Sequence, residues 1–335
     1  MKKLSLTTLV GLATVLGLAG TFAAAQKEES SAKEAPLPKT AAIIKSDPAF
    51  DEIVPAGAKL ELLKGGFDDG LEGGVWVRAG NYLLFSNKPH QTIDKWTLDG
   101  KHEVYLDLGK ITGKHGEDWT LSSGTTLDKD GRLVYTSPGE QAIIRIEKDG
   151  KRTMVATHYN GKRLVHPNDL VYKSNGTLYF TDNAAPPPGA KQELPFSVYM
   201  LKNGKVELLS TGLIKRPNGI ALSPDEKTLY VNNSTDKQIF RFDVKPDDTV
   251  ANGKLWIDLS KDLRPGVPDG MRVDEKGNVY DSGPGGIRVF APSGKQLGMF
   301  ELPDRATNMA FGDADGKTLY MANHTTLYRI KLKIP

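Results

Sequence analysis

Cysteine is missing from this chain of 335 residues. Its absence excludes disulfide bonds, thiolate nucleophiles, zinc–thiolate sites and iron–sulfur clusters. A strong net charge is missing as well, since 44 lysines and arginines face 41 aspartates and glutamates. Without a basic field to attract phosphates, we expect no nucleic-acid partner. The remaining composition, 39% hydrophobic and 25% charged, is typical of a globular protein with a sizeable core.

An export signal is indicated at the start of the chain. Residues 1–25 combine two lysines, an apolar run and three alanines directly before Gln26. This layout is typical of a cleaved secretory signal, and the run is too short and wrongly flanked for a spanning helix; an uncleaved anchor is the alternative. Cleavage would remove two lysines and lower the formal charge from +3 to +1. We therefore expect an exported protein, periplasmic or secreted, with no membrane span left.

A repeated unit organises the rest of the chain. Each copy has a polar corner, a short apolar strand, a turn and a second strand rich in β-forming residues. The second strands of the six copies begin 40 to 51 residues apart, at Leu83, Leu133, Leu178, Leu229, Val279 and Leu319. A period of about 40 to 50 residues with several short strands per repeat is the signature of a β-propeller blade. The sequence therefore predicts an all-β fold, a six-bladed β-propeller.

The boundaries of this domain follow from the same pattern. Residues 26–46 lack an apolar period, which predicts a disordered tether between the signal and a single propeller domain at 47–335. Segments 60–63 and 327–332 are both apolar enough to be strands. Because an open sheet edge invites aggregation, we expect these two segments to complete one blade together and close the ring.

The register of the repeat also predicts a site. The residues 10 or 11 positions before each second strand are Glu72, Ser123, Asn168, Asn218, Asp269 and Asn308. Rotation about the central channel relates these positions, so they should form one ring at one mouth of the channel. Asn, Asp and Ser also occupy turns for local hydrogen bonding, which is the alternative reading. However, carboxylates that share a site repel unless a cation lies between them, so the ring predicts a metal site.

Several sequence segments around the ring residues resemble segments of known proteins. They are Glu72-Gly73-Gly74-Val75-Trp76, Pro167-Asn168-Asp169-Leu170, Arg216-Pro217-Asn218-Gly219, Pro268-Asp269-Gly270-Met271 and Thr307-Asn308-Met309-Ala310. With these segments the chain resembles the gluconolactonase and regucalcin (senescence marker protein) group of six-bladed propellers, over roughly residues 60–332.

The resemblance implies roles for four of the ring residues. Glu72, Asn218 and Asp269 match the family's divalent-metal ligands, and Asn168 matches a residue that touches the metal or the substrate. Asp269 also matches the proposed general base. The chain departs from the family pattern in the second blade, in a proline-rich insertion at 183–189, and at His166, where some relatives have arginine. These departures concern the substrate rather than the metal positions.

Ligand type then predicts the cofactor and the reaction. The oxygens of Glu72, Asn168, Asn218 and Asp269 suit one hard divalent cation, most of all Ca²⁺, with Mg²⁺, Mn²⁺ or Zn²⁺ as alternatives. Such an ion can polarise a carbonyl, so we expect a metal-dependent lactonase that opens a small-molecule lactone such as gluconolactone. Asp269 would be catalytic, and Asn168, His166 and His324 would contact the substrate.

Two alternatives stay open at this point. A calcium-dependent arylesterase or phosphotriesterase would use the same kind of ion at the same place. A non-catalytic propeller scaffold with a structural ion is the rival from another class, although such a channel can be closed with apolar side chains. The absence of a Gly-X-Ser-X-Gly elbow argues against a serine esterase. The sequence leaves the oligomeric state open.

Overall fold

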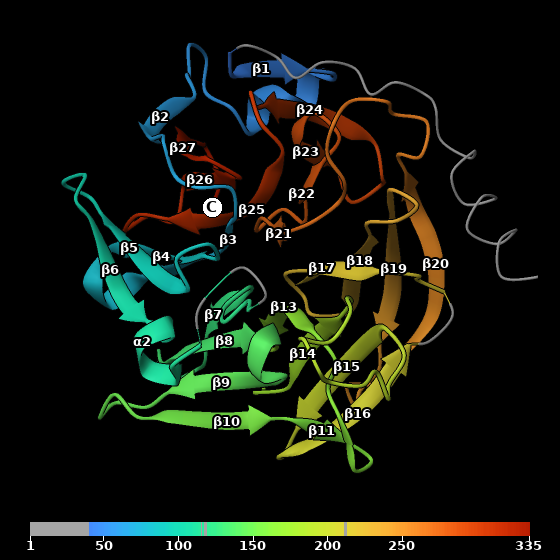
Figure 1. The fold of residues 1–335 in the computed structure, drawn as a ribbon. Helices are drawn as coiled ribbons and strands as arrows, with labels where there is room; N and C mark the ends of the chain where they lie inside the picture. Colours follow the sequence, from blue (N-terminus) through green and yellow to red (C-terminus); the bar gives the residue numbers. More distant parts are fainter. Residues whose placement is uncertain (1–39, 115, 117–118, 211–212) are drawn as a thin grey trace, which may run out of the picture. The chain divides into compact units, whose positions relative to one another are not determined.

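Antiparallel β-sheets make up nearly all of the described chain. The computed structural model describes residues 40–335 except 115, 117, 118, 211 and 212, so the predicted signal and most of the predicted tether lie outside the described residues. Six sheets of four or five strands are arranged in a ring (Figure 1). The prediction of an all-β, six-bladed propeller is confirmed.

Each blade runs from an innermost to an outermost strand. Blade 1 has β3 (Leu71–Val77), β4 (Tyr82–Asn87), β5 (Thr92–Thr97) and β6 (His102–Asp107); blade 2 has β7 (Thr125–Leu127), β8 (Leu133–Ser137), β9 (Ala142–Ile146) and β10 (Arg152–Ala156). Blade 3 has β13 (Pro167–Tyr172), β14 (Leu178–Asp182), β15 (Ser197–Lys202) and β16 (Lys205–Ser210); blade 4 has β17 (Pro217–Leu222), β18 (Thr228–Asn233), β19 (Gln238–Val244) and β20 (Val250–Asp258).

The last two blades each recruit a strand from the start of the domain. Blade 5 has β21 (Met271–Val273), β22 (Val279–Gly283), β23 (Gly286–Phe290) and β24 (Gln296–Glu301), with β1 (Ala42–Lys45) outside them. Blade 6 has β25 (Ala306–Gly312), β26 (Thr318–Asn323) and β27 (Thr326–Lys331), with β2 (Glu61–Lys64) outside them.

Short elements connect the strands. They are the 3₁₀ helices η1 (Pro48–Glu52), η2 (Arg78–Gly80) and η3 (Pro138–Glu140), the α-helix α2 (Leu108–Thr112), and a hairpin of β11 (His158–Tyr159) and β12 (Lys162–Arg163). Among the helices of the described residues, none is long and apolar enough to cross a membrane.

The closure of the ring follows the sequence-based expectation. Strand β2 pairs antiparallel with β27, with Glu61 opposite Arg329 and Leu62 opposite Tyr328. Blade 6 is therefore built from both ends of the domain, as predicted for segments 60–63 and 327–332. Joining the ends in one sheet removes the open edge that an unclosed ring would expose.

The predicted boundary of the tether at residue 46 is wrong. Residues 42–45 form β1, which pairs with β24 through contacts such as Ile43 opposite Phe300. A four-residue strand is too short to show a period, and its partner lies more than 250 residues away in the sequence, so local pattern could not reveal it. The folded domain therefore begins before Asp47, which caps η1 by accepting a hydrogen bond from the Ala49 backbone N–H at 2.9 Å.

The hydrophobic core lies between neighbouring blades. The six residues that define the repeat all lie on the second strands and are at most 4% exposed; they are Leu83, Leu133, Leu178, Leu229, Val279 and Leu319. Aromatic residues fill the same layer: Trp76 of blade 1 stacks on Tyr320 of blade 6 with 5.4 Å between ring centroids. The sheets are fixed to one another by this packing, which holds the starts of the innermost strands at constant positions around the channel.

Candidate functional site

The six predicted ring residues all lie at the start of the innermost strands. Glu72, Asn168, Asn218 and Asn308 are the second or third residues of β3, β13, β17 and β25, whereas Ser123 and Asp269 lie two residues before β7 and β21. The strand starts are equivalent in every blade, so the side chains emerge at one end of the channel.

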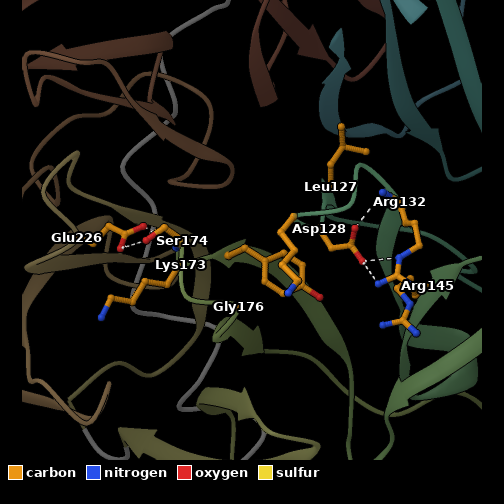
Figure 2. Close-up of a pocket in the computed structure, with 10 residues that line it drawn as sticks. Leu127, Asp128, Arg132, Arg145, Lys173, Ser174, Gly176 and Glu226 are labelled. Carbon is orange, nitrogen blue, oxygen red and sulfur yellow. Dashed lines mark hydrogen bonds and ion pairs between the residues drawn. The ribbon is translucent and has the colours of Figure 1, made fainter. Parts of the chain in front are cut away.

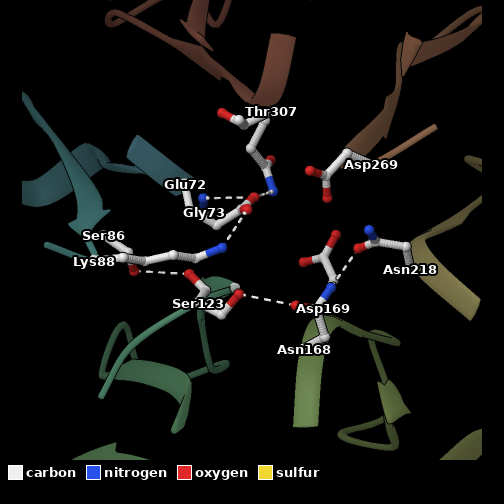
Figure 3. Close-up of polar contacts among 12 residues, drawn as sticks. Glu72, Gly73, Ser86, Lys88, Ser123, Asn168, Asp169, Asn218, Asp269 and Thr307 are labelled. Atoms are coloured by element: carbon white, nitrogen blue, oxygen red, sulfur yellow. Dashed lines mark hydrogen bonds and ion pairs between the residues drawn. The ribbon is translucent and has the colours of Figure 1, made fainter. Parts of the chain in front are cut away.

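Hydrogen bonds connect the ring residues to one another. Asn308 donates through Nδ2 to Glu72 Oε1 at 3.1 Å, and the Ser123 hydroxyl donates to Asn168 Oδ1 at 3.0 Å. Asn168 in turn donates through Nδ2 to Asn218 Oδ1. Figure 3 shows the carboxylate of Asp269 facing the same space as these side chains. The structure thus brings together the four predicted metal ligands, Glu72, Asn168, Asn218 and Asp269.

Irregular backbone aims the side chains of the ring. The innermost strands β3, β13, β17 and β25 each lose regular pairing register next to their ring residue. A bulge of this kind adds a residue to one strand and turns its side chain out of the sheet alternation. The ring residues of these four strands consequently point into the channel mouth instead of into the layers between blades.

Polar side chains of the second strands form hydrogen bonds with the backbone at or beside the ring residues. In five places such a side chain donates, at 2.6–3.1 Å, to a backbone carbonyl of the next blade at or beside its ring residue. The side-chain donors and the residues whose carbonyl accepts are, in order, Ser86 to Ser123, Thr136 to Asn168, Thr181 to Asn218, Asn232 to Asp269, and Ser282 to Thr307. These contacts between blades fix the ring backbone, and no sequence motif had indicated them.

Glycine follows the ring residue in four blades because the neighbouring strand lies too close for a side chain. A Cβ on Gly73 would lie 1.9 Å from the Ser123 carbonyl oxygen, and one on Gly219 would lie 1.9 Å from the Asp269 carbonyl oxygen. Gly73 also has φ +50, which favours glycine. In blade 3 the equivalent residue is Asp169, so a carboxyl group enters the channel where other blades have glycine.

Negative charge accumulates around the ring. Burial raises the pKa of Asp269 well above its usual value, and the nearby charge of Glu72 raises it further. Burial also raises the pKa of Asp169, to about 6, and its Oδ2 has no hydrogen-bond partner in the described part of the chain. Burial would likewise raise the pKa of Glu72, but the ammonium of Lys88 and the amide of Asn308 lower it overall.

Lys88 is the residue at the channel mouth that sequence reasoning missed most clearly. Its Nζ lies 2.9 Å from Glu72 Oε2, and the Glu72 side chain is only 5% exposed. Figure 3 shows the lysine reaching the space that Glu72, Asp269 and Asn218 face. Counting from the repeat could have found it, since Lys88 follows the second strand of its blade just as Ser234 does, and Ser234 accepts from Asn218 Nδ2 at 3.0 Å.

The two histidines predicted to contact substrate lie outside the ring. His166 is partly buried two residues before Asn168, and its Nδ1 lies 3.0 Å from the Ala185 carbonyl oxygen in the proline-rich insertion. Burial lowers the pKa of His166 to about 4, and the charges of Lys88 and Arg216 act in the same direction, so the imidazole is neutral. His324 contacts Asp69, and the structure does not bring it into contact with the four metal positions within the described residues.

The donor set fits a hard cation. Within the described residues, no group of three histidine or acidic side chains is arranged as ligands, and the ring instead offers two carboxylates and two amides. Glu72, Asp269 and Asp169 bring three carboxyl groups to this space, where the ammonium of Lys88 contacts Glu72 and the charge of Arg272 acts on Asp169. A divalent ion among these oxygens would compensate the remaining charge.

A cavity lies at the other end of the innermost strands. It has a volume of about 390 Å³ and is formed by the turns that join first to second strands in blades 2, 3 and 4 (Figure 2). Two of its basic side chains are already paired: Arg132 with Asp128 at 2.8 Å, and Lys173 with Asp248 at 2.5 Å. The ring is therefore the better candidate for chemistry.

Comparisons with known proteins point the same way. A family model described as the SMP-30/Gluconolactonase/LRE-like region matches residues 71–325. A gluconolactonase of Zymomonas mobilis is 33% identical over 316 residues, which are 87% of this chain and 86% of that protein. A pentonolactonase of Haloferax volcanii is 29% identical over 241 residues, which are 68% of this chain and 78% of that protein.

A solved structure shares the architecture. The gluconolactonase of Xanthomonas campestris superimposes with a TM-score of 0.76 at 28% identity, covering 89% of this chain and 98% of that one. The range that the family model matches, residues 71–325, includes all six ring positions, from Glu72 to Asn308.

Proposed function

The chain belongs to the SMP-30/Gluconolactonase/LRE-like family, and on that premise we propose that it is a lactone hydrolase that depends on a divalent metal ion. The substrate we propose is a sugar lactone such as gluconolactone, because two relatives are named for the hydrolysis of aldonic acid lactones. The observation that carries the proposal is the ring itself, where Glu72 and Asp269 face one space with two amide oxygens.

The proposed ion is Ca²⁺, held by the oxygens of Glu72, Asn168, Asn218 and Asp269. Oxygen ligands suit Ca²⁺, Mg²⁺ or Mn²⁺ better than Zn²⁺, which prefers histidine or cysteine. When bound, such an ion polarises a carbonyl group and lowers the pKa of water. The contact of Lys88 with Glu72 is compatible with an ion, because Lys88 and Arg272 together leave one of the three carboxyl groups without a compensating charge.

The residues of the chain then have distinct tasks. Asp269 accepts a proton from the attacking water and returns it to the ring oxygen of the lactone as the carbon–oxygen bond breaks. The amide of Asn168 and the neutral imidazole of His166 hold the substrate hydroxyl groups. His324 would contact only a substrate that extends over the mouth, since its present partner is Asp69.

Substitution of Asp269 by Asn tests the proposal. An amide keeps one ligating oxygen and the shape of the side chain, but it cannot accept a proton from water at neutral pH. We expect Asp269→Asn to lose about 100- to 10,000-fold in kcat on gluconolactone. Calorimetry should still detect divalent-ion binding, although with a weaker Kd.

Asp274→Asn is the matched control. Asp274 is a buried carboxyl at the far end of β21 in the same blade, where it accepts hydrogen bonds from the backbone N–H groups of Lys276 and Asn278. This variant should keep its turnover per folded molecule. Near-normal hydrolysis by Asp269→Asn at saturating ion would show that Asp269 is only a ligand, and His166 would be the next residue to change.

Export is proposed on the sequence alone. Residues 1–25 should be removed, and the mature periplasmic or secreted protein should begin at or near Gln26. The intact mass of the exported protein tests this, and retention of Met1 in a membrane fraction would indicate an anchor instead.

A further inference from the structure

Lys88 occupies a position that recurs in every blade. It is the first residue after the second strand, at the channel mouth. The equivalent residues are Lys88, Pro138, Asn183, Ser234, Pro284 and His324. Lys88 is the one with a permanent charge and with a side chain long enough to cross from the rim to the ring. The chain has therefore placed one fixed cation beside the four oxygen ligands.

The ammonium is only partly used by the protein. Its contact with Glu72 Oε2, at 2.9 Å, is a hydrogen bond to one acceptor, whereas an ammonium has three N–H donors. The Lys88 side chain is 32% exposed while that of Glu72 is 5% exposed, so the lysine stands on the solvent side of the glutamate. Within the described residues, N–H donors of Lys88 thus remain available on its solvent side, at the channel mouth.

An ammonium group in this position has no lone pair with which to act as a base. It can act as a hydrogen-bond donor and as a positive charge.

We propose that Lys88 is a catalytic residue whose Nζ donates a hydrogen bond to the carbonyl oxygen of the lactone and stabilises the negative charge that develops there. This inference rests on the proposed function and deepens it. Donors placed where an oxyanion forms act strongly in a site that excludes water.

The bond changes balance without any further reactant. The oxygen of water forms a bond to the carbonyl carbon, and the carbonyl electron pair moves to the oxygen that Lys88 contacts. When the pair returns, the bond from carbon to the ring oxygen breaks, and the ring oxygen takes the proton that Asp269 accepted from water. The product is a hydroxy acid, which loses one proton to solvent and leaves a carboxylate beside Lys88.

A purely structural role for Lys88 makes a different prediction. If the lysine only neutralises Glu72, its removal should destabilise the fold without affecting turnover or product binding. If it contacts the substrate, its removal should slow turnover and weaken product binding. In both cases divalent-ion affinity should rise, because a positive charge beside the ligands is gone.

The experiment compares Lys88→Met and Lys88→Arg with wild type. We expect kcat of Lys88→Met at saturating Ca²⁺ to fall about 100- to 1,000-fold, the usual loss for one oxyanion donor, with partial recovery in Lys88→Arg. Calorimetry with Ca²⁺ should give a tighter Kd for Lys88→Met. Gluconate should bind to Lys88→Met more weakly than to wild type.

Lys95→Met is the matched control. Lys95 lies in the same blade and is also paired with a glutamate, Glu103, at 2.6 Å, but it lies on β5 away from the mouth. The control should keep wild-type kcat and gluconate binding. A Lys88→Met protein with kcat within about threefold of wild type and unchanged gluconate binding would overturn the proposal.

Failure of the proposed function is distinguishable from failure of this inference. If wild type itself opens no lactone, the lactonase proposal fails. The comparison of gluconate and Ca²⁺ binding between wild type and Lys88→Met then decides whether Lys88 binds a carboxylate in this site. If wild type and Lys88→Met bind gluconate equally well, or if neither binds it, the role of Lys88 is rejected.

Discussion

Buried carboxyl groups are paired differently at the channel mouth and at the other end of the strands. At the channel mouth, burial raises the pKa of Asp269 and of Asp169, and the charge of Glu72 raises both further. At the other end of the innermost strands, Asp248 is as deeply buried but fully paired, with Lys173 at 2.5 Å and Lys202 at 2.7 Å. The Oδ2 of Asp169, which has no hydrogen-bond partner in the described part of the chain, supports the proposed cation site at the mouth, whereas pairing with two lysines gives Asp248 a structural role.

The pairing of Asp248 predicts a pH-dependent contribution to stability. Burial alone would raise the pKa of Asp248, but hydrogen bonds from Lys173 and Lys202 lower it overall. Because the pKa is lower in the folded than in the unfolded state, where it is about 3.9, the stabilisation is complete above about pH 5 and is lost as pH falls below that. Asp248→Asn should cost about 2 kcal/mol at pH 7.

Thermal unfolding of wild type and Asp248→Asn from pH 7 to pH 3 is the measurement. The difference in Tm should be largest at pH 7 and should narrow towards pH 3. Asn tolerates the positive φ of residue 248, +72, so the substitution changes charge without straining the backbone. A difference in Tm that is the same at both pH values would contradict the assignment.

The sequence predicted ring residues better than it predicted their neighbours. Glu72, Asn168 and Asn218 lie 10 or 11 residues before the first apolar residue of a second strand, so the repeat alone identified them. Lys88 and Asp169 break the repeat: the residues equivalent to Lys88 share no side-chain type, and those equivalent to Asp169 are mostly glycine. Counting from the repeat locates Lys88 at the channel mouth, but the direction in which its side chain and that of Asp169 point in the folded ring is not encoded by any local pattern.

At the scale of the strands, close approach of the innermost strands sets the position of the ring. Gly219 allows β17 to lie against the backbone of Asp269, whose carbonyl oxygen would be 1.9 Å from an added Cβ. A backbone atom cannot move aside as a flexible side chain can. Strand spacing and site geometry are therefore coupled at this glycine.

Gly219→Ala should consequently reduce both stability and turnover. Overpacking of this kind costs about 1–3 kcal/mol, and the shift of Asp269 should reduce kcat in the fraction that remains folded. Gly65→Ala is the control, since its added Cβ would meet only a side-chain methyl of Thr326 at 3.4 Å. Thermal unfolding with a lactone assay checks both; a Tm and kcat of Gly219→Ala equal to those of Gly65→Ala would contradict the coupling.

Strand pairing over long distances was predictable where the topology demands it. A ring must join its ends, so the pairing of β2 with β27 could be expected from the fold class. Closure of the ring does not require β1 to extend blade 5. Strand β1 pairs with β24 at the free edge of that blade. The boundary of the tether was misplaced for this reason.

At the scale of the whole molecule, the site exists only when the ring is closed. Each of the four proposed ligands belongs to a different blade, so their separation depends on the packing of all six sheets. An ion that binds only the folded state should stabilise it, by about 2.7 kcal/mol when its concentration is 100 times Kd. Catalysis and global stability should therefore respond to the same ion.

Removal and return of that ion test the central claim most directly. The purified protein would be stripped of divalent ions, checked by elemental analysis, and assayed for gluconolactone hydrolysis and Tm before and after Ca²⁺ is added back. A metal-dependent lactone hydrolase should lose hydrolysis and several degrees of Tm together, and should regain both with Ca²⁺ or another divalent ion. Full hydrolysis and an unchanged Tm in protein proven to be free of metal would contradict it.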